Sequence, residues 1–149
     1  MSKLTRATRP DRGALPPKPP VKRSISPARQ KAREDGIRAE RAAIEFLIRS
    51  GFGVLGSNLR VGRFEIDVLA ADGDVLVIVE VRTRGPGAFV RALDSIDARK
   101  RARLRLAGRW LWRDRYSKDA RFERLRFDCI AVRFSPTGPP EIEHVRAAF

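Results

Sequence analysis

Three carboxylates alternate with apolar residues in two β-branched runs that flank an Asp-Gly pair at residues 72–73. Glu65 and Asp67 belong to the first run, and Glu80 belongs to the second. Such runs around Asp-Gly predict an antiparallel hairpin, whose side chains alternate between two faces. Carboxylates on one face repel one another unless a positive charge lies among them, and a divalent cation is the obvious candidate. The alternative is the solvated face of a half-exposed sheet.

If Asp72 and Gly73 are the two loop residues, Ala71 pairs with Asp74. The expected cross-strand pairs then include Glu65–Glu80, Arg63–Arg82 and Asp67–Ile78. The charged face would hold Arg63, Glu65, Asp67, Glu80 and Arg82, and the other face Phe64, Ile66, Val68, Val77, Val79 and Val81. Residues 75–81 are apolar except at Glu80, which predicts a central strand buried on both sides. A carboxylate there is costly without a partner.

The composition bounds the class of protein. The 149 residues suit one domain, and the formal net charge of +14, with a pI near 11.4, indicates polyanionic partners, nucleic acid above all. A ribosome-associated or polybasic membrane-surface protein would share this balance. The single cysteine excludes an intramolecular disulfide, and the single histidine argues against a His-rich metal site. No apolar run reaches about 18 residues and no secretory signal is seen, so we expect a cytoplasmic protein without a transmembrane helix.

The first 26 residues are rich in proline and basic side chains. Six of the ten prolines fall within the first 27 residues, and acid is almost lacking. We expect residues 1–26 to be a disordered basic arm, since they contain too little apolar surface to fold alone. The arm either adds affinity for nucleic acid or is a passive extension. Residues 27–149 then form the folded domain.

A first helix is predicted over residues 27–50, with Gly51 as the terminating residue. Its core-facing line is expected to run through Ile37, Ile44 and Leu47. Glu40 falls on the same line, where a carboxylate costs stability unless it is paired or binds a metal. The alternative is a glutamate at the helix edge that reaches solvent. A strand over residues 52–61 follows.

A second helix is predicted over residues 98–115, after N-cap residues at 94–97. It is very basic, with Arg99, Lys100, Arg101, Arg103, Arg105, Arg109, Arg113 and Arg115. Its packed side would hold Leu104, Ala107 and Leu111, with Trp110 beside them in the core. Because almost no acid offsets the charges, a phosphate-facing surface is favoured over a merely solvated one.

Two more strands are predicted, over residues 125–134 and 141–145. Asp128 lies within the first, where a salt bridge to an arginine is favoured over a role in a site. Cys129 is expected to be a buried small apolar residue. His144 is expected to be a surface or packing residue rather than a ligand.

Several segments match a known family in order and spacing. They are G-I-R-A-E-R-A-A at 36–43, R-F-E-I-D-V-L-A at 63–70, D-G-D-V-L-V-I-V-E-V-R-T-R at 72–84, D-A-R-K-R at 97–101, R-F-D-C-I-A-V at 126–132 and I-E-H-V-R-A-A-F at 142–149. Over residues 32–149 the chain resembles the YraN family of small bacterial proteins. That family resembles archaeal Holliday-junction resolvases and the wider PD-(D/E)XK nuclease superfamily. The resemblance implies an α/β fold, a restriction-endonuclease-like mixed β-sheet flanked by helices.

The resemblance also implies a site. Asp67 matches the strand-borne Asp, and Glu80 the Glu of the E-x-K triplet, which together hold Mg²⁺ or Mn²⁺. Glu40 matches the first-helix glutamate that completes the site, and Glu65 belongs to the family's G-E-I-D pattern as a supporting residue. Hard oxygen ligands suit Mg²⁺, and the E-x-R spacing puts Glu80 and Arg82 on one face of a strand. The basic residues expected to contact nucleic acid are Arg60, Arg63, Arg84, Arg99, Lys100, Arg101 and Arg103.

Two departures weaken the case for turnover but not for binding. Arg82 stands where the superfamily has Lys, and a guanidinium orients water or clamps phosphate but is a poor acid–base group. Phe64 replaces the usual glycine before Glu65.

Three functions remain open. The first is a Mg²⁺-dependent endonuclease acting on DNA, with branched or junction DNA as one candidate substrate. The second is a nucleic-acid-binding protein on the same fold with a weak or inactive site. The third is a basic ribosome-associated or assembly factor whose acidic cluster pairs with arginines. Resolvase-like chemistry would favour a homodimer, because a junction offers two equivalent strands.

Overall fold

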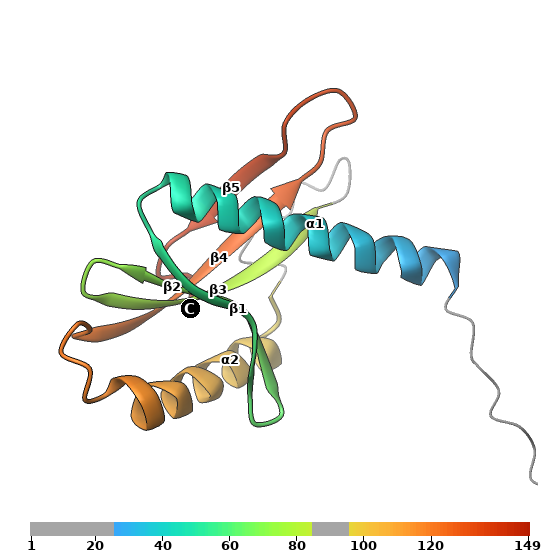
Figure 1. Ribbon diagram of the computed structural model, residues 1–149. Coiled ribbons are helices and arrows are strands. Elements are labelled where there is room, and N and C mark those ends of the chain that lie inside the picture. The colour runs from blue at the N-terminus through green and yellow to red at the C-terminus, as the bar shows by residue number, and fades with distance from the viewer. Residues whose placement is uncertain (1–25, 85–95) are drawn as a thin grey trace, which may run out of the picture.

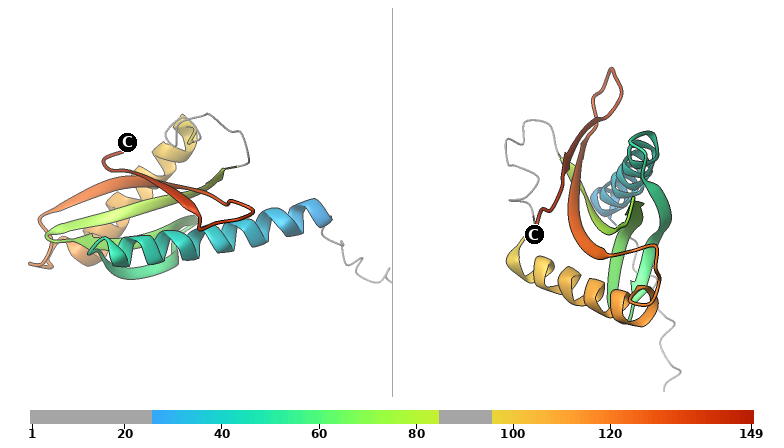
Figure 2. Two further views of the ribbon diagram at one scale, coloured as in Figure 1. Left: turned by 90° about the horizontal axis from the view of Figure 1, so that it is seen from above. Right: turned by 90° about the vertical axis from the view of Figure 1, so that its left-hand side faces the viewer.

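A computed structural model describes residues 26–84 and 96–149 of the protein (Figure 1). The predicted basic arm therefore lies outside the described residues except for Ser26, and so does the segment that follows Arg84. Five strands form one sheet, and helices α1 and α2 lie on opposite sides of it (Figure 2). The expected α/β fold, a mixed sheet flanked by helices, is confirmed.

The strands follow one another in the sheet as they do in the chain. They are β1 (Gly53–Val61), β2 (Phe64–Asp72), β3 (Val75–Arg84), β4 (Arg124–Arg133) and β5 (Glu141–Val145). Neighbours are antiparallel except for β3 and β4, which are parallel because α2 lies in the connection between them. Residues 75–80 of β3 are all buried, which confirms the predicted central strand.

Helix α1 (Pro27–Arg49) begins where the sequence indicates, with the Ser26 side chain accepting a hydrogen bond from the Arg29 N–H. It ends before Gly51, whose φ of +88° is the left-handed conformation that glycine tolerates. Its core face is made of Ala39, Ala42, Ala43 and Leu47. The prediction that Ile37 faces the core was wrong, since Ile37 is 45% exposed. Small alanines let the helix lie close to the sheet, and this turns Ile37 outward.

Helix α2 (Ala98–Leu111) begins at Asp97, whose side chain accepts a hydrogen bond from the Lys100 N–H, and continues into a π-helical turn, Trp112–Tyr116. Leu104, Ala107 and Leu111 are buried as expected. Trp110 is 38% exposed, so the expectation that it belongs to the core was wrong. It packs edge-on against Phe64 at the rim of the β1–β2 turn.

The register of the β2–β3 hairpin differs from the prediction by two residues. The turn is Gly73-Asp74, and Ala71 pairs with Leu76 rather than with Asp74. Gly73 has φ +60° and Asp74 does not have a positive φ, as in a type II′ turn with glycine first. Asp-Gly and Gly-Asp are both good hairpin pairs, so the local sequence does not choose between them. Asp72 stays in the strand, where it forms an ion pair with Arg126.

The alternation of β2 breaks at Asp67. Phe64 and Ile66 pack on the α2 side, whereas Val68 packs on the α1 side with Val77 and Val79. The predicted apolar face, which grouped Phe64 and Ile66 with these valines, was therefore wrong. The cause lies in the adjacent strand, β1. There Asn58 has a left-handed φ of +51°, between the pairs Ser57–Val68 and Leu59–Ile66. Asparagine tolerates this conformation better than most residues.

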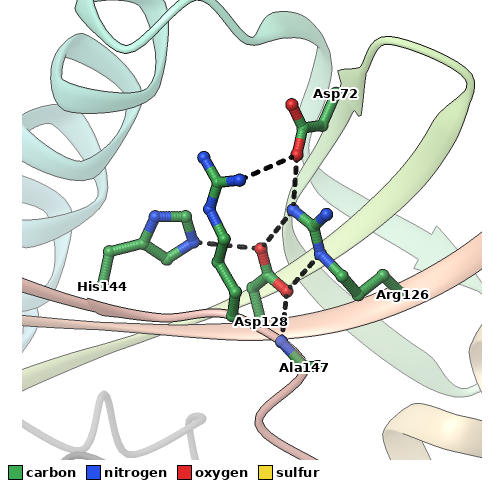
Figure 3. Close-up of polar contacts among 6 residues, drawn as sticks. Asp72, Arg126, Asp128, His144 and Ala147 are labelled. Carbon is green, nitrogen blue, oxygen red and sulfur yellow. Dashed lines mark hydrogen bonds and ion pairs between the residues drawn. The ribbon is translucent and has the colours of Figure 1, made fainter.

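A polar network runs from Asp72 at the hairpin end of β2 to Asp128 of β4, which pairs with Val79 (Figure 3). Asp128 is fully buried and accepts hydrogen bonds from Arg126 Nε (2.8 Å) and the Ala147 N–H (3.0 Å), with His144 Nε2 at 3.0 Å. Burial alone would raise the pKa of Asp128, but the hydrogen bonds from His144, Arg126 and Ala147 together lower it. Arg126 also reaches Asp72 at the hairpin end, so the network joins β2, β4 and the C-terminal segment. The expected salt bridge of Asp128 is confirmed.

His144 and Cys129 serve packing. The imidazole of His144 makes edge contacts with Phe46 and Phe52, and Cys129 is completely buried. Both observations agree with the sequence. Within residues 26–84 and 96–149, neither helix combines the length and apolar character that crossing a bilayer requires.

Candidate active site

The site is built where β2 and β3 separate. Their ladder runs from Asp72–Val75 to Val68–Val79 and ends one residue before Asp67 on one strand and Glu80 on the other. Beyond this point the Val81 N–H donates to Asp67 Oδ2 at 2.8 Å. A side-chain carboxylate thus replaces the backbone acceptor that a continuous ladder would provide. The break holds Asp67 beside Glu80, although not in the predicted pairing with Ile78.

Glu80 is the most unusual residue of the central strand, because its side chain is only 1% exposed. It lies on the α2 side, where Lys100 Nζ approaches Oε1 to 2.5 Å, while Arg82 Nη1 stays at 3.6 Å. Among the described residues, neither oxygen of Glu80 receives a hydrogen bond of normal geometry. The carboxylate is therefore compensated by charge but not saturated by donors.

The two carboxylates influence one another electrostatically. The pKa of Asp67 is raised to about 6, by burial first and then by the neighbouring charge of Glu80, while the Val81 N–H and the charge of Lys100 act in the opposite direction. Like charges brought together in a poorly hydrated place resist joint ionisation. A cation that bound between Asp67 and Glu80 would relieve this repulsion.

Glu40 is not joined to this pair. It lies on α1, where Oε2 accepts a hydrogen bond from Asn58 Nδ2 at 2.9 Å, and it lines a pocket of about 270 Å³ that also includes Arg82. Val81, whose N–H holds Asp67, lines the same pocket, so Glu40 is a neighbour of the site. In the described part of the chain no three Asp, Glu, His or Cys side chains gather closely enough to form a metal centre. Of the three carboxylates expected to lie together, Asp67 and Glu80 do so, and Glu40 does not join them.

A basic groove opens between the β1–β2 turn and the first half of α2. Glu65 and Lys100 line one pocket of about 240 Å³, and an adjoining pocket of about 480 Å³ extends along the same helix. Three arginines border the groove, over an apolar floor: Arg63, Arg99 and Arg103, above Phe64, Ala102, Leu104 and Leu106. The groove begins at Lys100, the residue that contacts Glu80, so it leads from the carboxylate pair along a positively charged wall.

The other basic residues predicted to contact nucleic acid differ in their environment. Arg84 forms an ion pair with Glu143 at 3.0 Å, and Arg101 Nε donates to the Ile96 carbonyl at 2.7 Å, so both have roles within the fold. Arg60 is exposed on β1 and stands opposite Glu65 in the ladder.

The chain was compared with known proteins. The family model described as "Uncharacterised protein family UPF0102" matches residues 39–132, which is more than half of the chain and includes Glu40, Asp67, Glu80 and Lys100. The chain belongs to the UPF0102 family. The resemblance to the YraN family noted from the sequence is thereby confirmed.

The matches between this UPF0102 protein and its relatives extend over most of each relative's length. A UPF0102 protein of Sorangium cellulosum (strain So ce56) is 52% identical over 124 residues, 83% of this chain and 86% of its own. One from Pseudomonas paraeruginosa is 39% identical over 81% of this chain and 96% of its own, and one from Kineococcus radiotolerans 40% identical over 74% and 88%. These names give no activity, so the chemistry must be argued from the site.

The residues present fit a hard divalent cation. Mg²⁺ is commonly held by one or two carboxylates, with water and substrate phosphate completing its shell. Asp67 and Glu80 supply two carboxylates, and Glu80 Oε2, which has no hydrogen-bond partner among the described residues, is the ligand type such an ion needs. The single histidine packs against Phe46 and Phe52, whereas the single cysteine, Cys129, lies opposite Glu80 in the β3–β4 ladder. The pKa of the Cys129 thiol is raised to about 12, by burial first and then by the charge of Glu80, so it remains a neutral thiol and oxygen is left as the donor type.

Sequence reasoning assigned Lys100 to the nucleic-acid surface and missed its contact with Glu80. One signal was present, because α2 carries a single lysine among five arginines. Asn58, which shapes the strand break and holds Glu40, was not singled out as a site residue. No local pattern distinguishes it, since its left-handed conformation depends on the neighbouring strand.

Proposed function

We propose that this UPF0102 protein is a metal-dependent endonuclease that acts on DNA. The observation that carries the proposal is the buried Asp67–Glu80 pair at the break between β2 and β3, beside a groove lined with arginines. A deeply buried glutamate whose Oε1 has ion pairs with Lys100 and Arg82, and whose Oε2 has no hydrogen-bond partner among the described residues, is costly for a purely structural role. The net charge of +14 supports a polyanionic substrate.

The proposed role of each residue follows from the chemistry of its side chain. Asp67 and Glu80 would hold Mg²⁺ or Mn²⁺, which supplies a more acidic bound water and neutralises charge that develops on the phosphate. Arg63 and Arg103 would bind the phosphate backbone, because guanidinium groups match phosphate oxygens in pairs. The groove accommodates a strand that runs along α2, which suits backbone contacts more than readout of base edges.

A second candidate is a nucleic-acid-binding protein whose site turns over weakly or not at all. Arg82 favours it, since a guanidinium at this position is a poor proton donor or acceptor. Glu40 favours it too, because its carboxylate is bound to Asn58 rather than added to the pair.

The test is a cleavage assay with end-labelled duplex, single-stranded, flap and four-way-junction DNA in Mg²⁺ or Mn²⁺. We expect cleavage by the wild type, and a loss of about 100-fold or more in Asp67→Asn and in Glu80→Gln. Glu45→Gln is the matched control, since this exposed glutamate of α1 has only a long ion pair with Arg49 at 3.9 Å. It should cleave like the wild type.

The outcomes separate the functions. Salt-sensitive binding that survives both substitutions, without cleavage of any substrate, would select the binding protein. Failure to bind DNA or RNA at moderate salt would contradict both and leave the assembly factor. Preference for the junction or flap over linear duplex would define branched DNA as the substrate.

A further inference from the structure

Within the described residues, the cation nearest to Glu80 does not come from its own strand. Arg82, two residues along β3, stays 3.6 Å from Oε1, whereas Lys100 of α2 reaches the same oxygen at 2.5 Å. The side chain of Lys100 is one-third exposed, so one end of it touches a buried carboxylate while the residue still borders the groove. Among the described residues, no other side chain both forms an ion pair with Glu80 and lines the groove.

Lys100 is held in this place by its helix. Its own N–H donates to the capping carboxylate of Asp97 at 2.6 Å, and Arg101 Nε fixes the preceding turn through the Ile96 carbonyl. Farther along α2, Gly108 lies so close to the sheet that a Cβ atom would come within 2.7 Å of Ile78 and Phe127. The cap and the close packing set the height of the first turn above the sheet.

The chemistry of a lysine differs from that of an arginine at such a point. An ammonium group is compact and carries three donors that can point to different acceptors, whereas a guanidinium is a planar fork. Lys100 can therefore contact Glu80 and still donate to a water or a phosphate oxygen. Lys100 borders the 240 Å³ pocket together with Arg63 and Arg103, where a phosphate would be bound. It thus stands between the carboxylate pair and the phosphate.

We propose that Lys100 is the lysine of this site and replaces, from helix α2, the lysine that the E-x-R triplet of β3 lacks. The inference rests on the proposed nuclease function for its catalytic part, and on the contact with Glu80 for its placement. Arg82 then has a supporting role, beside the pocket that contains Glu40.

The test compares Lys100→Met, Arg82→Met and a matched control, Lys118→Met, which changes an exposed lysine that follows the π-helical turn and does not line the groove. Mn²⁺ affinity is measured by calorimetry without DNA, and cleavage by single-turnover kinetics at saturating DNA. A fourth protein, Lys100→Met with Arg82→Lys, returns a lysine to the strand. Circular dichroism establishes that each variant is folded, and Lys100→Gln, which also removes the charge, replaces Lys100→Met if the latter does not fold.

The expected results follow from the position of the ammonium group. Lys100→Met should lose about 100-fold or more in single-turnover rate, the range found when a positioned donor to developing charge is removed, with a much smaller change in DNA affinity. Its Mn²⁺ affinity should rise about tenfold, because a positive charge next to Glu80 is removed. Lys118→Met should retain the wild-type rate, Arg82→Met should lose less of it than Lys100→Met, and the double variant should recover part of it.

Other results overturn the inference or separate it from the proposed function. Wild-type cleavage by Lys100→Met, or a larger loss in Arg82→Met, would contradict it, as would Mn²⁺ affinity that does not change. Tighter Mn²⁺ binding by Lys100→Met with no cleavage by any protein would support the placement of Lys100 while refuting the nuclease. Absence of Mn²⁺ binding in the wild type and in Lys100→Met would refute both.

Discussion

At the scale of single residues, the site depends on a carboxylate pair held where a β-ladder stops. Asp67 accepts a hydrogen bond from the Val81 N–H, which a backbone carbonyl of the neighbouring strand would otherwise accept. Glu80 is buried against Lys100. Neither arrangement stabilises the fold as well as an uninterrupted ladder with apolar side chains would. Polar groups kept at such a cost are typical of functional sites rather than of packing.

Asp67 should make the protein less stable as the pH rises. Its pKa is raised from 3.8 to about 6, so between these values the folded state retains a proton that the unfolded chain has released, and stability falls as pH increases. Asp67→Asn removes this dependence. Urea unfolding from about pH 4 to about pH 8 should show the variant gaining on the wild type with pH, to about 2 kcal/mol at the upper end.

The control for this prediction is Asp114→Asn, which removes one negative charge from an exposed position on the π-helical turn. Its stability should stay parallel to that of the wild type. A variant Asp67→Asn that is less stable than the wild type at about pH 8 would contradict the assignment.

At the scale of elements, the site is a meeting of three parts. The β1–β2 turn provides Arg63, the β2–β3 break provides the carboxylates, and the first turn of α2 provides Lys100. Helix α2 can approach only because Gly108 has no side chain, which brings its backbone next to Ile78 and Phe127. Close packing at Gly108, in the middle of α2, thus helps to determine where Lys100 lies at the start of the helix.

Gly108→Ala should destabilise the protein although alanine favours helices. The added Cβ would lie 2.7 Å from buried Ile78 and from Phe127, and overpacking of this kind costs about 1–3 kcal/mol. Gly36→Ala on α1 is the matched control, because nothing lies within 4 Å of its Cβ position. It should gain up to about 1 kcal/mol from helix propensity. Equal changes in the two variants, measured by urea unfolding, would refute the close approach of α2.

At the scale of the whole molecule, positive charge is in excess, but its placement matters more than its sum. The groove collects Arg63, Arg99 and Arg103 on the side of the sheet that α2 covers. Other basic residues, such as Arg126 and Arg84, are used in ion pairs that join strands. The groove combines this positive charge with access to the carboxylate pair through Lys100.

Removal of two groove arginines should lower the salt dependence of DNA binding. In Arg99→Gln with Arg103→Gln, the slope of log K against log salt should decrease by about 2, because each phosphate contact contributes about 0.9. The control is Arg33→Gln with Arg41→Gln, two exposed arginines of α1 on the other side of the sheet. This change of equal charge should leave the slope nearly unaltered. Equal effects of the two pairs would indicate binding by diffuse charge alone.

The sequence by itself determined the elements and most of their limits. Ser26, Gly51 and Asp97 mark helix ends through side-chain and backbone chemistry that acts within one turn, and the run 75–81, apolar except at Glu80, marks the central strand. The family resemblance pointed to Asp67 and Glu80, and the structure brings these two together.

Only the tertiary structure decided what lies between the elements. The hairpin register depended on whether Asp72 paired with Arg126 or entered the turn, and the strand break on the left-handed backbone of Asn58. The contact of Lys100 with Glu80 and the bond of Glu40 to Asn58 join residues that are 20 and 18 positions apart. Propensities and periodicities describe neighbours along the chain, whereas these contacts are set by how closely a helix can approach a sheet.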